Sequence, residues 1–159
     1  LIKKKIKKLT VKNLQNKNLL SDKVAVSASI IAKEKKIRDV VKKFQQNYAY
    51  NPPKKYNGSV LDGRDITSVI FKDAMFKFFI TANIKVRARR RFKEYKNQNK
   101  KISFNKVLKS LKNRDKSDRQ RKYGPLKKTK DSILLNSTKL SRRQCFLKIK
   151  AIMDRKLNK

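Results

Sequence analysis

The sequence lacks histidine and contains a single cysteine, Cys145, among its 159 residues. These absences exclude histidine-based general base catalysis, zinc centres and a disulfide framework within the chain. Cys145 recurs with Ile149 and Met153 at helical spacing and is interpreted as a core thiol. No apolar run approaches the roughly 20 residues that span a bilayer, and no secretory segment is visible, which predicts a cytoplasmic protein without membrane contact.

Acidic residues are also scarce, because 11 Asp and Glu stand against 47 Lys and Arg, giving a formal charge of +36. A surplus of this size attracts polyanions and steers anionic ligands toward the surface. Two interpretations stay open: a lysine bias of the whole proteome, and a surface selected to bind nucleic acid. The apolar content of 38% argues against a wholly disordered chain and favours one folded domain.

Apolar periodicity predicts helices that alternate with strands. Residues 24–50 contain no glycine or proline and are mostly helix, and the turn-forming residues 51–58 end that helix. Strands are predicted at residues 59–61, 76–83 and 132–138, and further helices at 84–98, 103–121 and 141–157. This alternation favours βαβ units, and therefore an α/β fold with a parallel sheet.

The motif DGRD, at residues 62–65, directly follows the first predicted strand. Ligands of open parallel sheets bind beyond the carboxyl ends of the strands, so the motif stands where an α/β fold keeps its site. The alternative is an ordinary turn, because Asp-Gly is common turn chemistry.

The helix predicted at residues 103–121 carries an apolar stripe that runs into charged residues of the same phase. Apolar side chains recur at helical spacing from Phe104 to Leu111, and the same face continues with Arg114, Asp118 and Arg121. Two guanidinium groups beside a carboxylate can grip phosphate, while the acid accepts from sugar hydroxyls or holds the arginines in place. The alternative is a solvated salt-bridged helix end, worth only about 0.3–0.5 kcal/mol per pair.

A second arginine-rich segment is VRARRR, at residues 86–91. It places Arg87 and Arg91 four positions apart on another predicted helix. By itself this segment is interpreted as a basic surface.

Several segments follow one another in a recognisable order: VAVSAS, IRDVV, DGRDITSVIF, FFITANIKVRARRRFKE, LKNRDKSDRQRKYGPL and ILLNST. From about Val24 to the C-terminus, this order resembles the bacterial cytidylate kinases, the CMP and dCMP kinase branch of the nucleoside monophosphate kinases. DGRD followed by the arginine-rich segment carries most of the resemblance.

The resemblance implies an α/β fold of the P-loop NTPase type, in which helices flank a parallel sheet that is incomplete at the N-terminus. A single kinase domain is expected, of which this chain is the C-terminal part. Its regions are expected to be the monophosphate-binding region at residues 1–58, core strands at 59–83, the lid region at 84–125, and a core strand with the C-terminal helix at 126–159.

The resemblance also implies a role for each candidate site residue. Ser29 and Arg38 match positions that hold the cytosine base, and Arg64 and Asp65 match the nucleotide contacts of DGRD. Arg114 and Arg121 match lid arginines that meet phosphate, and Asp118 matches a carboxylate that meets the ribose. By extension, Asp62 is assigned to Mg²⁺, directly or through water, and Arg87 and Arg91 are added as phosphate contacts.

The implied function is phosphoryl transfer from ATP to CMP or dCMP in the presence of Mg²⁺. This chemistry depends on positioning and charge neutralisation, and so it requires no histidine. The expected partners are the two nucleotides, with nucleic acid bound only non-specifically through charge. The protein is expected to be a monomer.

Three features depart from the family pattern. Ser117 stands where a further charged residue is common, and the loop AYNPPKKYN is longer than usual. The third departure is the phosphate loop GxxxxGK[ST], which is absent from a sequence whose only glycines are Gly58, Gly63 and Gly124.

Together with a first residue other than methionine, the missing loop predicts a C-terminal portion of a kinase that is inactive alone. Such a portion would expose apolar surface at an open sheet edge. Two alternatives stay open: a basic nucleic-acid-binding module, and a degenerate kinase-like domain kept for interaction.

Overall fold

The computed structural model describes residues 8, 13, 16, 19 and 21–158. The chain divides into two compact units: unit 1 comprises residues 1–73 and 114–127, and unit 2 comprises residues 74–113 and 128–159. Within the described part of the chain, no helix is both long and apolar enough to cross a membrane.

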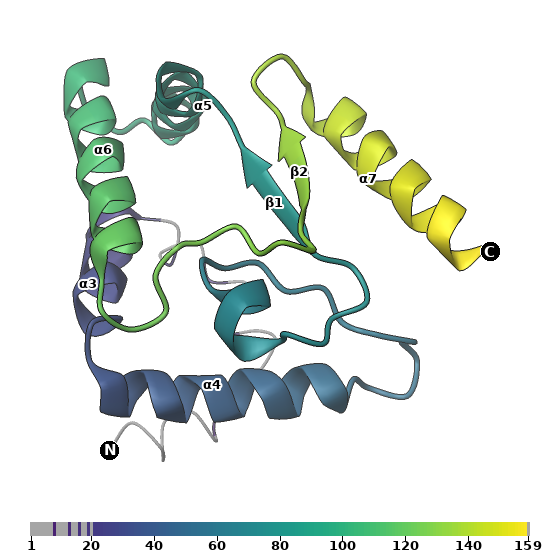
Figure 1. Cartoon of the computed structure of the whole chain (residues 1–159). Helices are drawn as coiled ribbons and strands as arrows, with labels where there is room; N and C mark the ends of the chain where they lie inside the picture. The colour runs from purple at the N-terminus through teal and green to yellow at the C-terminus, as the bar shows by residue number, and fades with distance from the viewer. Residues whose placement is uncertain (1–7, 9–12, 14–15, 17–18, 20, 159) are drawn as a thin grey trace. The chain divides into compact units, whose positions relative to one another are not determined.

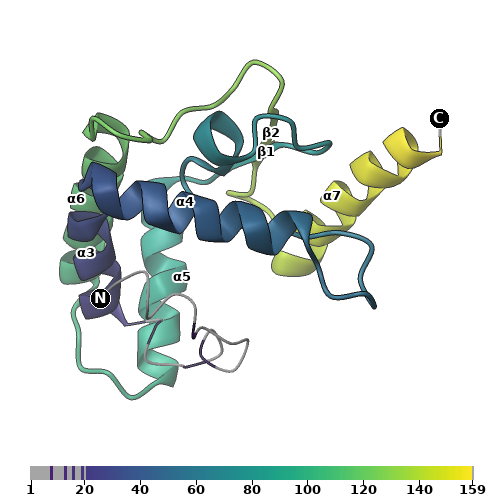
Figure 2. The ribbon, with the colours of Figure 1, turned by 90° about the horizontal axis from the view of Figure 1, so that it is seen from below.

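Unit 1 begins with two helices, α3 (Asp22–Ile31) and α4 (Lys35–Tyr50). The prediction that residues 24–50 are mostly helix is confirmed, although the chain turns between α3 and α4 (Figure 2). At this break the carbonyl of Ala32 accepts a hydrogen bond of 3.2 Å from Nη1 of Arg38. The side chain thus satisfies a backbone group that a continuous helix would have paired internally.

Helix α4 contacts the segment 65–73 along its whole length. Near its start Arg38 pairs with Asp65, and further along Gln46 donates to the carbonyl of Ile70 at 3.0 Å. At its end the Tyr50 hydroxyl donates to the Asp73 carboxylate, at 2.8 and 3.0 Å from its two oxygens. The contacted segment contains a short π-helix, η2 (Ile66–Ile70). These polar contacts fix η2, and the residue that precedes it, against α4.

The strand predicted at residues 59–61 is wrong. These residues have no regular secondary structure, and the side chain of Val60 is fully exposed. A strand requires a neighbour for its backbone hydrogen bonds, and no described strand pairs with this segment. Instead, the Ser59 hydroxyl donates to the carbonyl of Ala49 at 3.0 Å, which fastens the loop to the end of α4. The DGRD motif therefore leads from an irregular segment into η2.

Unit 2 contains the parallel strands β1 (Phe78–Thr81) and β2 (Ile133–Asn136), which lie side by side in Figure 1. Phe78 pairs with Ile133 at one end of the ladder and Thr81 with Asn136 at the other. The crossover includes α5 (Ile84–Asn97) and α6 (Phe104–Gln120), and α7 (Arg142–Leu157) follows β2. The two strands and the parallel pairing predicted from the sequence are confirmed.

The core of unit 2 lies between α5 and the first half of α6. Ala88 and Tyr95 on α5 pack with Val107 on α6, and all three are buried. The rings of Phe92 and Phe104 meet edge to face with their centroids 6.0 Å apart. The apolar stripe expected on the helix at residues 103–121 therefore faces a core, as its spacing predicts.

Helix α7 has no buried side chain. Its N-terminus is closed by a capping box, in which Ser141 and Gln144 each accept a hydrogen bond from the backbone of the other. Cys145 is only half-buried, so its interpretation as a core thiol is wrong.

The ion pair between Lys77 and Asp131 should make unit 2 sensitive to acid. The buried Lys77 ammonium, helped by Thr129, holds the pKa of Asp131 down to about 2 from an ordinary value of 3.8. Because the folded-state pKa is the lower one, the pair stabilises the fold above about pH 4 and is lost as the pH falls toward 2. We expect Asp131→Asn to lower the urea midpoint at pH 7, and the difference from wild type to shrink toward pH 2.

Asp154→Asn is the matched control, because it removes the same charge from the exposed pair with Lys150. It should leave the midpoint nearly unchanged at every pH. Equal losses in the two variants would contradict a specific role for Asp131.

Candidate functional site

Unit 1 contains a cavity of about 680 Å³ between α3, α4, residues 63–70 and the segment that begins at the end of α6. Seven of the residues singled out in the sequence line it: Ser29, Arg38, Arg64, Asp65, Arg114, Asp118 and Arg121. The fold thus brings together side chains from four separate segments. Their roles toward a ligand stay predictions.

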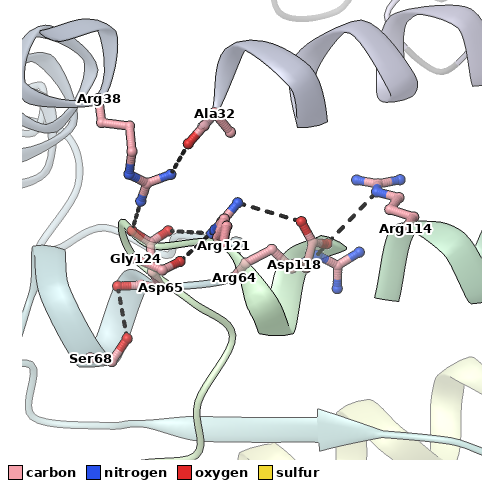
Figure 3. A network of polar contacts seen from close by, with 9 residues as sticks. All are labelled: Ala32, Arg38, Arg64, Asp65, Ser68, Arg114, Asp118, Arg121 and Gly124. Atoms are coloured by element: carbon pink, nitrogen blue, oxygen red, sulfur yellow. Dashed lines mark hydrogen bonds and ion pairs between the residues drawn. The ribbon is translucent and has the colours of Figure 1, made fainter. Parts of the chain in front are cut away.

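Asp65 is a buried carboxylate held by two arginines (Figure 3). Its Oδ2 pairs with Nη2 of Arg38, which reaches it from α4. Its Oδ1 lies 3.5 Å from Nη2 of Arg121, which follows α6. A carboxylate removed from water needs such charged partners, so this pairing fixes the approach of both arginines.

Asp118 forms a second buried centre, one turn before Arg121. Its side chain is only 4% exposed, and its Oδ1 lies 3.4 Å from Nη1 of Arg121. Its Oδ2 lies 3.2 Å from Nε of Arg64 and 3.9 Å from Nε of Arg114. Neither this Oδ2 nor Nε of Arg114 has a hydrogen bond of good geometry among the described residues. Oδ2 of Asp118 is thus a buried acceptor whose hydrogen-bonding capacity is not used among the described residues.

Arg121 connects the two carboxylates, and its side chain is only 5% exposed. Its third nitrogen, Nε, donates to the carbonyl of Gly124 at 2.6 Å. Burial lowers the pKa of the Arg121 guanidinium, the charge of Arg38 lowers it further, and the two carboxylates oppose this shift. Arginine remains charged regardless. Arg64 and Arg114 are more accessible, at 40% and 36% exposed, and are better placed to meet an incoming anion.

Gly124 is a site residue that the sequence analysis did not single out. Its φ is +56°, a left-handed conformation that favours glycine. A Cβ at this position would overlap the Arg38 guanidinium and the Asp65 carboxylate. The available signal was a glycine directly before Pro125, a dipeptide typical of a turn.

Ser117, noted in the sequence as a departure, lies beside the cavity wall. Its Oγ is 3.4 Å from Oγ of Ser29, which lines the cavity. Tyr123, which no sequence motif indicated, is the one aromatic side chain among the described residues that line the cavity. The Ser29–Ser117 contact joins segments 88 positions apart, so no local sequence pattern could have predicted it.

The remaining predicted site residues do not line this cavity. Arg87 and Arg91 belong to unit 2, where Nε of Arg87 donates to the carbonyl of Ala82 and Nη1 of Arg91 pairs with Glu94. Asp62, the first residue of the DGRD motif, is exposed. The described residues contain no group of three His, Cys, Asp or Glu side chains that could hold a metal ion.

The parallel strands with flanking helices place the chain in the α/β class, and comparison with known proteins refines this class to the nucleoside monophosphate kinase fold of the P-loop NTPases. The family model for cytidylate kinase matches residues 2–155, and the chain belongs to the cytidylate kinase family. This result does not favour the alternative of a nucleic-acid-binding module.

Two similar proteins carry the name cytidylate kinase. One, from Clostridium botulinum (strain Loch Maree / Type A3), is 43% identical over 129 residues, which cover 81% of this chain and 57% of the relative. The other, from Mesomycoplasma hyopneumoniae (strain 7448), is 37% identical over 148 residues, covering 91% of this chain and 63% of the relative. The chain thus spans about three fifths of the length of the relatives it matches.

Substituting Gly124 tests whether the site depends on close backbone approach. We expect Gly124→Ala to lower the free energy of unfolding by roughly 1–2 kcal/mol, from the left-handed conformation alone. Displacement of Arg38 and Asp65 should add to this loss. Chemical denaturation measures the effect.

Gly58→Ala is the control, since nothing lies within 4 Å of a Cβ built there. Its effect should stay within about 0.5 kcal/mol. A Gly124→Ala variant as stable as the Gly58→Ala variant would contradict the close approach.

Proposed function

We propose that the protein transfers a phosphoryl group from ATP to CMP or dCMP, and that the cavity of unit 1 binds the monophosphate substrate. The observation that carries this proposal is the clustering of four arginines around two buried aspartates in the cavity wall. Membership of the cytidylate kinase family supports the choice of CMP or dCMP as the substrate of this cavity. The proposal concerns the activity of the whole enzyme.

We assign the nucleobase end of the substrate to Ser29, Arg38 and Asp65. Cytosine presents an amino group that donates, and a carboxylate such as Asp65 is a suitable acceptor for it. The Arg38 guanidinium and the Ser29 hydroxyl can donate to the carbonyl oxygen and ring nitrogen of the base. Uracil has a carbonyl oxygen where cytosine has its amino group, and this oxygen would face the Asp65 carboxylate acceptor to acceptor, so the assignment predicts a preference for cytosine.

We assign the phosphate and sugar end to the second buried centre. Arg64 and Arg114 present accessible guanidinium groups, whose forked geometry matches phosphate oxygens. The Oδ2 of Asp118, which has no well-formed hydrogen bond, suits a ribose hydroxyl. Arg121 holds both centres together and adds positive charge where negative charge develops during transfer.

The reaction class is consistent with a chain that has no histidine, because phosphoryl transfer relies on in-line positioning and charge neutralisation. Mg²⁺ would neutralise charge on the nucleotide phosphates, because it usually binds through substrate phosphates, one or two carboxylates and several waters. Asp62 is exposed and could supply one such carboxylate. Arg87 and Arg91 in unit 2 stay candidate phosphate contacts, and the cytoplasmic location and the monomeric state stay predictions.

Nucleotide titrations test whether the cavity recognises CMP or only negative charge. We expect the 159-residue chain to bind CMP at least about tenfold more tightly than UMP or AMP, since each mismatched base leaves polar groups unpaired. Between about 50 and 200 mM salt, CMP affinity should fall by at most about tenfold, whereas a long polyanion should lose about 10³-fold or more.

Isothermal titration calorimetry with the three nucleotides, and with poly(U) as the polyanion, measures both effects. Equal affinity for all three nucleotides, with the salt response of a polyanion, would favour the nucleic-acid alternative.

Arginine substitutions test the assignment of catalysis. In the complete enzyme we expect Arg114→Ala and Arg121→Ala each to lower kcat by about 10³-fold or more, because each removes charge that stabilises the transferring group. Arg121 is buried, and its loss should also destabilise unit 1, so each variant is compared by thermal unfolding as well.

Arg119→Ala is the matched control, because Arg119 is exposed in the last turn of the same helix. It should retain the wild-type kcat. A wild-type kcat for Arg114→Ala or Arg121→Ala would refute the corresponding assignment.

A further inference from the structure

Ser117 forms a second layer behind the cavity wall. Its Oγ lies 3.4 Å from Oγ of Ser29, and both residues are partly buried in unit 1. Ser29 lines the cavity from α3, whereas Ser117 belongs to α6 and is not among the lining residues. A ligand would therefore meet Ser29 directly, and any influence of Ser117 would pass through Ser29.

Ser117 lies on α6 between residues of the charged cluster. It stands three residues after Arg114 and four before Arg121, and so on the same helix face. Its carbonyl accepts the backbone N–H of Arg121 at 3.0 Å. The helical geometry therefore fixes the backbone position of Ser117 relative to the arginines on either side of it.

A serine hydroxyl has one donor and two acceptor positions, and it rotates to suit its surroundings. Contact with a second hydroxyl selects one of these orientations. Where Ser117 donates to Ser29, the Ser29 proton is free to point into the cavity; where Ser29 donates, its lone pairs face the cavity instead. In either case, the hydrogen bond with Ser117 determines whether Ser29 acts as a donor or as an acceptor toward a ligand.

We propose that Ser117 is a positioning residue, which orients the Ser29 hydroxyl for recognition of the nucleobase. This inference rests on the proposed function, in which Ser29 meets the cytosine ring. Helix α6 would then contribute to both ends of the substrate. It carries Arg114 and Asp118, which are assigned to the phosphate and sugar, and it also orients the Ser29 hydroxyl that contacts the base.

The test compares two ligands that share the sugar phosphate and differ in the base. Calorimetry on the 159-residue chain measures binding of CMP and of ribose 5-phosphate to wild type and to Ser117→Ala. The variant should bind CMP about 2- to 10-fold more weakly, the usual range for one hydrogen bond. It should bind ribose 5-phosphate as wild type does. In a Ser29→Ala background, Ser117→Ala should cause no further loss of CMP affinity.

Ser27→Ala is the matched control, since Ser27 is an exposed serine on the same helix as Ser29. It should change neither affinity. Alanine is well tolerated in helices, so both variants should fold, and thermal unfolding checks this.

The outcomes separate the inference from the function on which it rests. A wild-type chain that does not bind CMP would overturn the proposal that the cavity of unit 1 binds the monophosphate, and the inference with it. A wild type that binds CMP, beside a Ser117→Ala variant with unchanged CMP affinity, would overturn only the inference. Equal losses for CMP and ribose 5-phosphate would also overturn it, because Ser117 would then support the arginine cluster instead of the base contact.

Discussion

Unit 1 depends on the ion pairs that the buried carboxylate of Asp65 forms with Arg38 and Arg121. An unpaired carboxylate in this position would cost several kcal/mol of desolvation, so the fold is stable only when guanidinium groups approach it. Arg38 and Arg121 do so from segments that lie 27 positions before it and 56 positions after it. One acid thereby specifies how three distant parts of the chain meet. This explains why so basic a sequence keeps acids at this place.

The rest of unit 1 supports that pairing through helix α4. Successive contacts run in the same order along both partners: Arg38 with Asp65, Gln46 with the carbonyl of Ile70, and Tyr50 with Asp73. Such a series resists both sliding and rotation of the helix. The guanidinium of Arg38 therefore reaches the cavity from a helix that is held at several points along its length.

The parts of this structure that could be predicted were those with a strong local period. The phase of the stripe from Phe104 to Leu111 placed Arg114, Asp118 and Arg121 on one face, and these three residues do meet there. The break between α3 and α4 could not be predicted, because its carbonyl is satisfied by a side chain six residues away. The strand expected at residues 59–61 failed for a similar reason, since a strand exists only where another pairs with it. The Ser29–Ser117 contact likewise follows from packing between helices.

The net charge of the arginine–aspartate cluster bears on which ligands can neutralise it. Four guanidinium groups and two carboxylates leave a surplus of two positive charges in a partly dehydrated place. A phosphate monoester carries about −1.5 to −2 at neutral pH. A nucleoside monophosphate would therefore bring the cluster close to electroneutrality, whereas a nucleoside without phosphate would leave the surplus in place. If the cavity binds the monophosphate as proposed, the positive charge of this cluster would favour a phosphorylated ligand over a free nucleoside.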